Sequence, residues 1–351
     1  MKSIKVNAER TYEVQIDTEW LPAFTKLVQG RPRVGIIHSE GKLPGISQIP
    51  SLDSEVHYFP IPDGEAGKSL ETIKQVWNWL GSTGFTRSDL IVGIGGGTVT
   101  DLAGFAAATW LRGIDWVAVP TTIAGSVDAA VGGKTGINSD FGKNLIGSFH
   151  SPIAVIVDLQ WFSTLSDRDF SAGLAEVVKC GFIASPEILD LLEGKSLIDI
   201  RADQKLLSKL IELSVQTKAS VVSADFKESF EREVLNYGHT LGHAIEKHSN
   251  FDLRHGEAIS IGLVFAANLS QRLLGLDPAV VARHRLLLTN LNLPTTYSAS
   301  AWAELRALMG IDKKTRGAQL RFVGLSGTAR THRIEGPSED DLAAAYEKVS
   351  S

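Results

Sequence analysis

Residues 90–101 read Leu90-Ile91-Val92-Gly93-Ile94-Gly95-Gly96-Gly97-Thr98-Val99-Thr100-Asp101. The apolar run at the start is typical of a buried strand, and the glycines after it let the backbone come close to a ligand. A helical pattern follows from Asp101, and a helix N-terminus supplies amide donors and a positive dipole. This order predicts a pyrophosphate site, with a tight strand-to-helix turn as the plainer alternative. The spacing differs from the usual dinucleotide fingerprint, because its last glycine position falls on Thr98 or Thr100.

Similar apolar runs occur at residues 33–38, 116–120 and 154–158, and helical patterns lie between them at 69–81 and 101–111. Strands that alternate with helices predict a parallel sheet with both faces covered. After about Thr164 the pattern becomes mostly helical. The expected helices span residues 171–184, 205–223, 234–247, 257–274 and 278–288, with short strands near 319–325 and 332–334.

The change of pattern near Thr164 divides the chain. We predict a Rossmann-like α/β nucleotide-binding domain over residues 1–165 and a mainly α-helical domain over residues 166–351, with ligands bound in the cleft between them. The length of 351 residues agrees with two domains, because it exceeds what one typical hydrophobic core supports.

Composition narrows the class of protein. The net charge of -5 gives no indication of nucleic-acid binding. The single cysteine, Cys180, excludes an internal disulfide framework and fits a reducing cytosol, so we expect a cytoplasmic protein. No apolar run reaches about 18 residues, and the N-terminus is polar and strand-like, so neither a membrane span nor a signal peptide is expected.

Three separated residues can meet at one metal ion: Glu176, His239 and His255. Two imidazoles and one carboxylate form a catalytic zinc set that leaves a coordination position open for substrate. A closed structural site would usually draw on cysteines, which this chain lacks apart from Cys180. Zinc and cobalt tolerate the same nitrogen and oxygen ligands, so the sequence leaves the native metal open.

Polar residues surround the expected ligands. Glu176 and Lys179 are three apart and share a helix face, which would be a surface ion pair in the simplest alternative. Arg232, Asn236, His239 and His243 are spaced to stack on one face of the helix expected at residues 234–247. Burying such a stripe is costly unless ligands satisfy it, so we predict a metal or substrate role for it.

A loop-like segment at residues 128–144 carries Asp128, Lys134, Lys143 and Asn144 among small residues. Its Gly133-Lys134-Thr135 resembles the end of a P-loop, but Asp128 stands where that motif requires glycine, so we exclude an NTPase. The charged residues suit an anionic substrate and proton transfer. A solvated polar loop is the alternative.

With these motifs in place, the chain resembles the 3-dehydroquinate synthases, the sugar-phosphate cyclases of the shikimate pathway, and most of all their actinobacterial members. The resemblance covers roughly residues 60–325 in the expected order. The segments that carry it are Pro62–Glu65 with Lys68, Gly95–Gly104, Trp110–Gly113, Pro120–Thr122, Val127–Asn138, Gly142–Gly147, Ala175–Lys179, Asn236–Glu246, His255-Gly256 and Asp312–Arg316.

The resemblance implies a cyclase that converts 3-deoxy-D-arabino-heptulosonate 7-phosphate into 3-dehydroquinate and phosphate, and thus a phosphate-eliminating carbon–oxygen lyase. A secondary alcohol is oxidised with NAD, phosphate is eliminated, the ketone is reduced again, the ring opens, and an intramolecular aldol reaction closes the carbocycle. The implied cofactors are NAD and one divalent metal, zinc or cobalt. A homodimer is also implied, because Arg112 would reach the substrate phosphate of a neighbouring subunit.

Site residues follow from the same resemblance. The phosphate would be bound by Lys134, Asn144, His243, Lys314 and Arg112. Lys218 and Arg232 would hold the substrate carboxylate, and Asp128, Lys134, Lys179 and Asn236 would border the reacting hydroxyls. The expected NAD positions are Asp63, Gly64, Glu65, Ala66, Gly67, Lys68, Gly97, Thr98, Val99, Thr100, Asp101, Thr121, Thr122, Lys134, Lys143, Phe162, Ser163, Thr164 and Leu165.

Some positions depart from the family pattern, and three other functions remain as alternatives to 3-dehydroquinate synthesis. Thr100 replaces a common glycine, Ser151 stands where Gln is usual, and the strand end expected to meet adenosine reads His38-Ser39-Glu40. The competitors are a sister cyclase for sedoheptulose 7-phosphate or an amino analogue, a metal- and NAD-dependent polyol dehydrogenase, and a non-catalytic NAD-binding protein. Lys218 and Arg232 together suit a carboxylate, which favours dehydroquinate formation.

Overall fold

The computed structural model describes residues 2–41, 53–227, 231–316 and 320–351, with only the backbone described for residues 311–316. The chain forms two compact units. Unit 1 comprises Met1–Thr164 and Lys218–Lys227, and unit 2 comprises Leu165–Thr217 and Glu228–Ser351. None of the helices in the described ranges combines the length and hydropathy that a membrane span requires.

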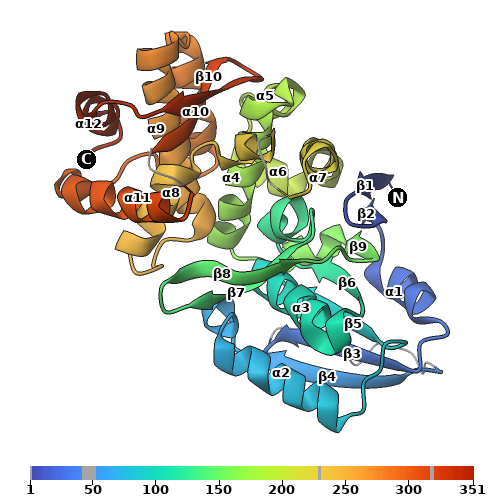
Figure 1. Cartoon of the computed structure of the whole chain (residues 1–351). Coiled ribbons are helices and arrows are strands. Elements are labelled where there is room, and N and C mark those ends of the chain that lie inside the picture. The colour runs from blue at the N-terminus through green and yellow to red at the C-terminus, as the bar shows by residue number, and fades with distance from the viewer. Residues whose placement is uncertain (1, 42–52, 228–230, 317–319) are drawn as a thin grey trace. The chain divides into compact units, whose positions relative to one another are not determined.

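Unit 1 is built on a seven-stranded sheet in the order β1-β2-β9-β6-β5-β3-β4 (Figure 1). Its strands are β1 (Lys2–Asn7), β2 (Thr11–Ile16), β3 (Arg33–Ser39), β4 (Glu55–Ile61), β5 (Leu90–Gly95), β6 (Asp115–Pro120) and β9 (Ala154–Val157). Neighbours are parallel except β1 and β2. Every residue of β5 is buried, as its apolar run requires for a central strand. The predicted α/β class and the four predicted strands are confirmed.

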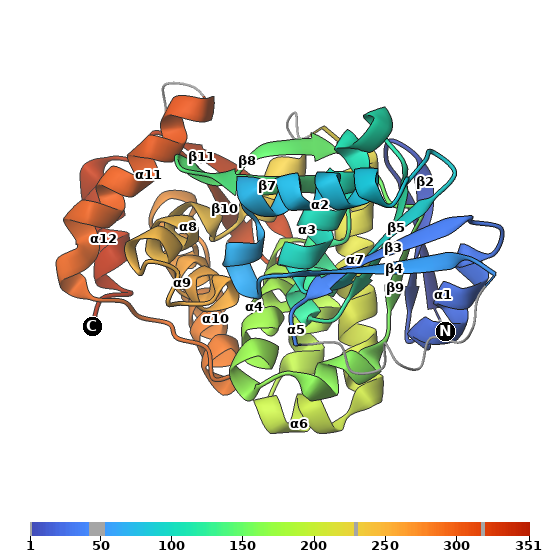
Figure 2. The same cartoon turned by 90° about the horizontal axis from the view of Figure 1, so that it is seen from below.

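Helices and short turns connect these strands. They are α1 (Trp20–Val28), η2 (Gly64–Gly67), α2 (Leu70–Ser82), α3 (Gly97–Thr109), η3 (Trp110–Arg112), η4 (Gly125–Ala129) and η5 (Leu159–Thr164). Helix α3 packs on β5 and β6, and α2 lies beside it (Figure 2). Because α3 begins at Gly97 and not at Asp101, the third glycine is part of the helix and Asp101 lies one turn inside it.

Residues 128–144 are not the loop that the sequence suggested. After the single turn of η4, strands β7 (Lys134–Ser139) and β8 (Gly142–Phe149) form an antiparallel hairpin, with Thr135 opposite Ser148. The hairpin packs against α3. A Cβ on Gly104 of α3 would lie 2.4 Å from the Thr135 side chain, so glycine at this position leaves room for the hairpin to pack on α3. Local composition does not reveal this contact.

Unit 2 is mainly helical, apart from the hairpin of β10 (Arg321–Gly327) and β11 (Arg330–Glu335). Its helices are α4 (Asp167–Ile183), α5 (Pro186–Leu192), α6 (Leu197–Ala202), most of α7 (Gln204–Ala224), η6 (Glu231–Asn236), α8 (His239–His248), α9 (His255–Leu274), α10 (Pro278–Asn290), η7 (Ala299–Ala301), α11 (Trp302–Arg316) and α12 (Glu339–Glu347). Helices α4, α8 and α10 all pack on the apolar α9. The expected strand at 319–325 includes Gln319, which lies outside the described residues.

One expected helix of unit 2 is divided. Residues 234–247 do not form one helix, because Gly238 has a left-handed backbone with φ of 79° and α8 begins only at His239. Residues 231–236 form the 3-10 turn η6, and Tyr237 lies between it and Gly238. The prediction that Arg232 and Asn236 share a helix face with His239 and His243 is therefore wrong.

Candidate active site

Glu176, His239 and His255 converge in unit 2. Glu176 lies in the middle of α4, and each histidine is the first residue of its helix, α8 or α9. Oε1 of Glu176 lies 3.2 Å from Nε2 of His255 and 3.6 Å from Nε2 of His239. One ligand atom from each residue lies within 4.8 Å of the other two. The carboxylate is only 1 % exposed, so its charge needs a cationic partner.

Close helix contacts bring the three candidate ligands together. A Cβ on Gly256, next to His255, would lie 1.7 Å from the carbonyl oxygen of Ala172 on α4. A Cβ on Gly262 of α9 would lie 2.0 Å from the carbonyl oxygen of Gly238, next to His239. Only hydrogen fits at these two crossings. Glycine therefore sets how near α4 and α8 come to α9.

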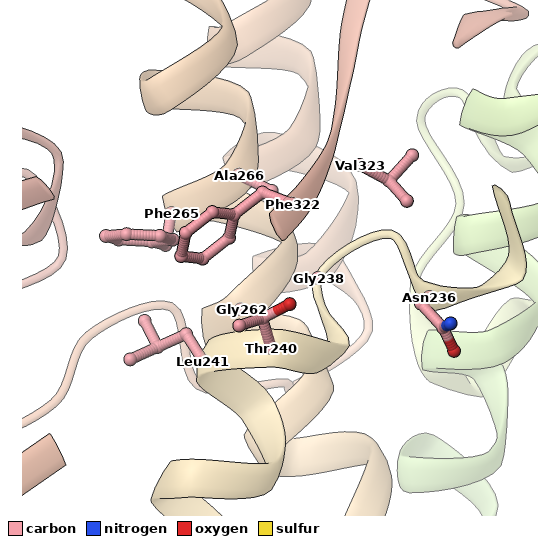
Figure 3. Close-up of a pocket in the computed structure, with 9 residues that line it drawn as sticks. All are labelled: Asn236, Gly238, Thr240, Leu241, Gly262, Phe265, Ala266, Phe322 and Val323. Carbon is pink, nitrogen blue, oxygen red and sulfur yellow. The ribbon is translucent and has the colours of Figure 1, made fainter. Parts of the chain in front are cut away.

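The crossing at Gly238 continues into a packed region (Figure 3). Phe265 of α9 and Phe322 of β10 lie together there, with ring centroids 5.9 Å apart. The region is lined by Asn236, Gly238, Thr240, Leu241, Gly262, Phe265, Ala266, Phe322 and Val323. Figure 3 shows Asn236 apart from the phenylalanine pair, beside the turn that leads into α8.

Each histidine has an outer partner that orients its ring. His239 Nδ1 lies 3.1 Å from the carbonyl oxygen of Tyr237, and His255 Nδ1 lies 3.1 Å from Oε2 of Glu246. A carbonyl oxygen only accepts, so Nδ1 of His239 carries the proton and Nε2 faces Glu176 with its lone pair. Paired carboxylate and carbonyl acceptors of this kind are usual behind metal-binding histidines.

The charges around the two rings differ. Burial and the nearby Lys179 ammonium lower the pKa of His239 to about 3, so this ring is neutral. Burial also lowers the pKa of His255, but the carboxylates of Glu246 and Glu176 outweigh it and raise the pKa to about 10. Two carboxylates that favour positive charge at His255 equally favour a divalent cation at its Nε2. The donor set and its outer partners therefore fit zinc or cobalt.

A second set of three donors shares His255. His243, Glu246 and His255 also offer ligand atoms within 4.8 Å of one another. In this set Glu246 and Nδ1 of His255 are already engaged with each other, as an outer acceptor would be. The set with Glu176 uses Nε2 and leaves that contact intact, so it is the better candidate for a metal site.

The two carboxylate oxygens of Glu176 have different partners. Its ammonium contacts Oε2, while Oε1 faces the histidines. Lys179 is 2 % exposed, so this pair lies in the interior and is not the surface pair that the sequence left open. His243 lies near the cluster, with its ring centroid 5.2 Å from that of His239. Arg232 is buried in η6.

Unit 1 holds a separate polar cluster beside the glycine-rich turn. Gly96 caps α3, so the first amides of the helix follow the glycines directly. Lys68 Nζ lies 2.6 Å from Asp101 Oδ2 and also contacts the side chain of Asn144. Burial raises the pKa of Asp101, although Lys68 opposes the shift. These contacts join the segment after η2 to both α3 and β8.

Asn138 joins the same cluster. Its side-chain amide donates to Glu65 Oε1 at 2.6 Å, and its oxygen accepts from the backbone of Asn144 at 3.0 Å. Lys143 Nζ lies 3.7 Å from Oε2 of Glu65. Three expected NAD positions, Glu65, Lys68 and Lys143, thus contact the β7–β8 hairpin or belong to it.

Asp128 and Lys218 form another pair within unit 1. The Lys218 ammonium contacts both the carboxylate and the backbone oxygen of Asp128. The turn after Asp128 is also held by Tyr12 of β2, whose hydroxyl accepts from the Gly132 amide at 2.8 Å. Lys134, at the start of β7, follows this turn directly.

The other expected residues fall as follows. Asp63, Gly64, Ala66 and Gly67 lie at or in η2, Thr98, Val99 and Thr100 in the first turn of α3, Thr121 and Thr122 after β6, Phe162, Ser163 and Thr164 in η5, and Leu165 at the start of unit 2. Arg112 is an exposed residue of η3 with φ of 64°. Lys314 lies in α11, with its side chain outside the described residues.

Three contact residues received no role from the sequence: Tyr237, Glu246 and Asn138. Glu246 is seven residues after His239, a spacing that returns to the same helix face and could have pointed to it. No comparable signal marks the backbone carbonyl of Tyr237 or the amide of Asn138.

Two family models match consecutive parts of the chain. The family model described as 3-dehydroquinate synthase N-terminal matches residues 58–172, and the one described as 3-dehydroquinate synthase C-terminal matches residues 173–315. The 3-dehydroquinate synthase of Thermobifida fusca is 50 % identical over 97 % of this chain and 94 % of its own. That of Mycolicibacterium vanbaalenii is 47 % identical over 99 % of this chain and 98 % of its own.

A solved structure shares the fold. The 2-epi-5-epi-valiolone synthase from Streptomyces hygroscopicus, with NAD+ and Zn2+ bound, aligns with a TM-score of 0.89. The alignment covers 99 % of this chain and 98 % of that one at 25 % identity. The sequence identity to the two 3-dehydroquinate synthases is thus about twice the identity to this structure.

Proposed function

Since the chain belongs to the 3-dehydroquinate synthase family, we propose that it converts 3-deoxy-D-arabino-heptulosonate 7-phosphate into 3-dehydroquinate and inorganic phosphate. The observation that carries this function is the convergence of Glu176, His239 and His255 in a chain that matches these synthases almost end to end. The reaction is a step of the shikimate pathway towards aromatic amino acids. It makes the enzyme a phosphate-eliminating lyase.

The cofactors are NAD and one divalent metal ion. When bound, NAD supplies a reversible hydride acceptor and the metal a Lewis acid for the oxygen of the oxidised carbon. Glu176, His239 and His255 would hold the metal. Tyr237 and Glu246 keep the two imidazoles turned towards it, so that little reorganisation is needed when substrate arrives. Lys179 balances the charge of Glu176 and borders the reacting hydroxyls, where an ammonium can hold or pass a proton.

The cationic residues of both units suit an anionic sugar phosphate. Lys134, Asn144, His243, Lys314 and Arg112 are assigned to the phosphate, Lys218 and Arg232 to the carboxylate, and Asp128 and Asn236 to the hydroxyls. Lys218 already donates to the backbone and side-chain oxygens of Asp128, so binding the substrate carboxylate requires a change in these contacts. An ammonium has three donors, so Lys218 would exchange part of this contact for the substrate carboxylate.

Residues 1–165 are assigned to NAD. The amides at the start of α3 and the cluster around Lys68 suit a pyrophosphate and its ribose. The assigned positions are Asp63–Lys68, Gly97–Asp101, Thr121, Thr122, Lys134, Lys143 and Phe162–Leu165. Residues 166–351 are assigned to the metal and substrate. We further propose a cytoplasmic homodimer, in which Arg112 of one subunit completes the phosphate site of the other.

Phosphate release tests this function. The enzyme with catalytic NAD and added zinc is given 3-deoxy-D-arabino-heptulosonate 7-phosphate or sedoheptulose 7-phosphate, with and without a chelator. We expect chelator-sensitive release from the first sugar alone and no lasting NADH. Turnover of the second sugar alone would assign the chain to the sister cyclases. Lasting NADH without phosphate would indicate a polyol dehydrogenase.

Matched variants link the activity to the cluster. His255→Ala should abolish phosphate release, because it removes one ligand and the partner of two carboxylates. His248→Ala is the control, since His248 lies on α8, the helix of His239, but contacts the hydroxyl of Tyr297. Equal losses in both variants would contradict the assigned metal site.

A further inference from the structure

His284 is a buried histidine that the proposed reaction does not use. It lies on α10 and is 0 % exposed. Its ring stacks on Phe182 of α4, with centroids 3.3 Å apart and planes 11° apart. An apolar side chain would fill the same place without the cost of burying two ring nitrogens, so the polar ring needs a reason.

The hydrogen bonds of His284 define its tautomer. Nδ1 lies 2.7 Å from the carbonyl oxygen of Val280, and Nε2 lies 2.9 Å from the hydroxyl of Tyr237. The carbonyl only accepts, so Nδ1 carries the proton. Burial lowers the pKa of His284 to about 3, so the ring stays neutral and its Nε2 accepts from the tyrosine hydroxyl.

Tyr237 connects this ring to a metal ligand. Its side chain is 0 % exposed, and its backbone oxygen accepts from Nδ1 of His239. Gly238, the next residue, has a left-handed backbone, so the chain turns sharply between the tyrosine and the ligand. The position of the Tyr237 carbonyl therefore depends on how its side chain is anchored, and His284 holds the far end of that side chain.

The same ring also touches the helix of a second ligand. Phe182 is three residues after Lys179 and six after Glu176 on α4. His284 thus contacts α4 through a stacked ring and the His239 segment through a hydrogen bond. Fully satisfied buried polar contacts of this kind select one arrangement of the elements they join.

We propose that His284, acting through Tyr237, is a positioning residue for the metal centre. It fixes the carbonyl that sets the tautomer and direction of the His239 ring relative to Glu176. The inference rests on the metal site assigned above. It predicts that metal affinity depends on a hydrogen bond that touches neither the metal nor the substrate.

Cobalt binding tests this role without turnover. Metal-stripped protein is titrated with Co²⁺ against a competing chelator, and the ligand-field absorption of the bound ion is recorded. Tyr237→Phe removes only the hydroxyl, and His284→Leu removes the acceptor. Both should lower cobalt affinity by about 10–100-fold and change the absorption bands. His284→Gln keeps an oxygen that can accept from Tyr237 and should restore most of both.

Ser270→Ala is the matched control. Ser270 on α9 is also 0 % exposed, and its hydroxyl accepts from the Leu325 amide and donates to the Ala266 carbonyl. This variant should lose thermal stability while keeping the cobalt affinity and spectrum of the wild type. Wild-type affinity and spectrum in Tyr237→Phe and His284→Leu would overturn the positioning role, whatever their stability. A wild type that binds no cobalt would overturn the metal site itself, and phosphate release would then report separately on the reaction.

Discussion

Gly256→Ala tests whether helix packing sets the metal geometry. The added Cβ would lie 1.7 Å from the carbonyl oxygen of Ala172. An ordinary carbon–oxygen contact is about 3.3 Å, so α9 and α4 must separate by roughly 1.6 Å at this point. His255 is the residue before Gly256, and Glu176 lies one helical turn after Ala172. The separation therefore acts directly between two of the proposed ligands.

The expected loss of zinc affinity follows from the narrow range of distances that metal–ligand bonds allow. Ligand distances hold to within about 0.2 Å, so a shift several times larger breaks one bond or forces the helices apart at a cost of about 1–3 kcal/mol. We expect zinc affinity, measured by chelator competition, to fall by about 5- to 140-fold, the equivalent of this cost. Far-ultraviolet circular dichroism should show a folded protein.

The controls separate packing from helix propensity. Gly310→Ala places a Cβ 3.8 Å from a flexible arginine tip on α11, so it should bind zinc normally and gain up to about 1 kcal/mol of stability. Gly262→Ala repeats the test at the second crossing, where the Cβ would lie 2.0 Å from the Gly238 carbonyl oxygen. Folded Gly256→Ala with wild-type zinc affinity would refute the idea that glycine sets the ligand geometry.

Three further outcomes are expected. Glu246→Gln keeps the shape of the acceptor behind His255 but removes its charge, so zinc affinity in a chelator competition should fall about 10–100-fold. An unchanged affinity would show that the Glu246 carboxylate does not support the His255 ring as a metal ligand. The pKa of His284 is about 3 when folded and 6.5 ordinarily, so only the unfolded chain gains this proton as pH falls from 6.5 to 3. The free energy of unfolding should therefore drop as pH falls through this window. Denaturant titrations at several pH values give the slope of this free energy against pH, which should be smaller by about 1.4 kcal/mol per pH unit in His284→Gln. Equal slopes in the wild type and the variant would show that His284 protonates while folded. Tyr12→Phe leaves the Gly132 amide without its hydroxyl acceptor and should cost about 1–3 kcal/mol in urea unfolding, a loss that would be absent if that amide met water instead.

Local pattern was sufficient for most elements of this fold. The apolar run at 90–94 is long enough for one strand and ends in glycines, so it predicted β5 and the turn after it. The three residues chosen as ligands from their chemistry also lie together in unit 2. Glu176 lies within a long helix, the class of element that sequence patterns define best. His239 and His255 instead begin their helices, which the pattern placed at residues 234 and 257.

The remainder depends on contacts between distant residues. The helical pattern in the sequence continues across Gly238. The close approach of Gly262 and the left-handed backbone of Gly238 explain why α8 begins only at His239. The β7–β8 hairpin is rich in glycine, so its composition suggests a loop, although packing on α3 makes it a strand pair. Tyr237 acts through a backbone atom, which no residue type reveals.

All three proposed ligands belong to unit 2, whereas the glycine-rich turn belongs to unit 1. A metal that binds only the folded form of unit 2 adds its binding free energy to that unit, about 2.7 kcal/mol at a free concentration 100 times its dissociation constant. A nucleotide at the start of α3 would add its own increment to unit 1. Each cofactor would thus protect a different part of the chain from hydrogen exchange, and starvation for the metal would expose unit 2 first.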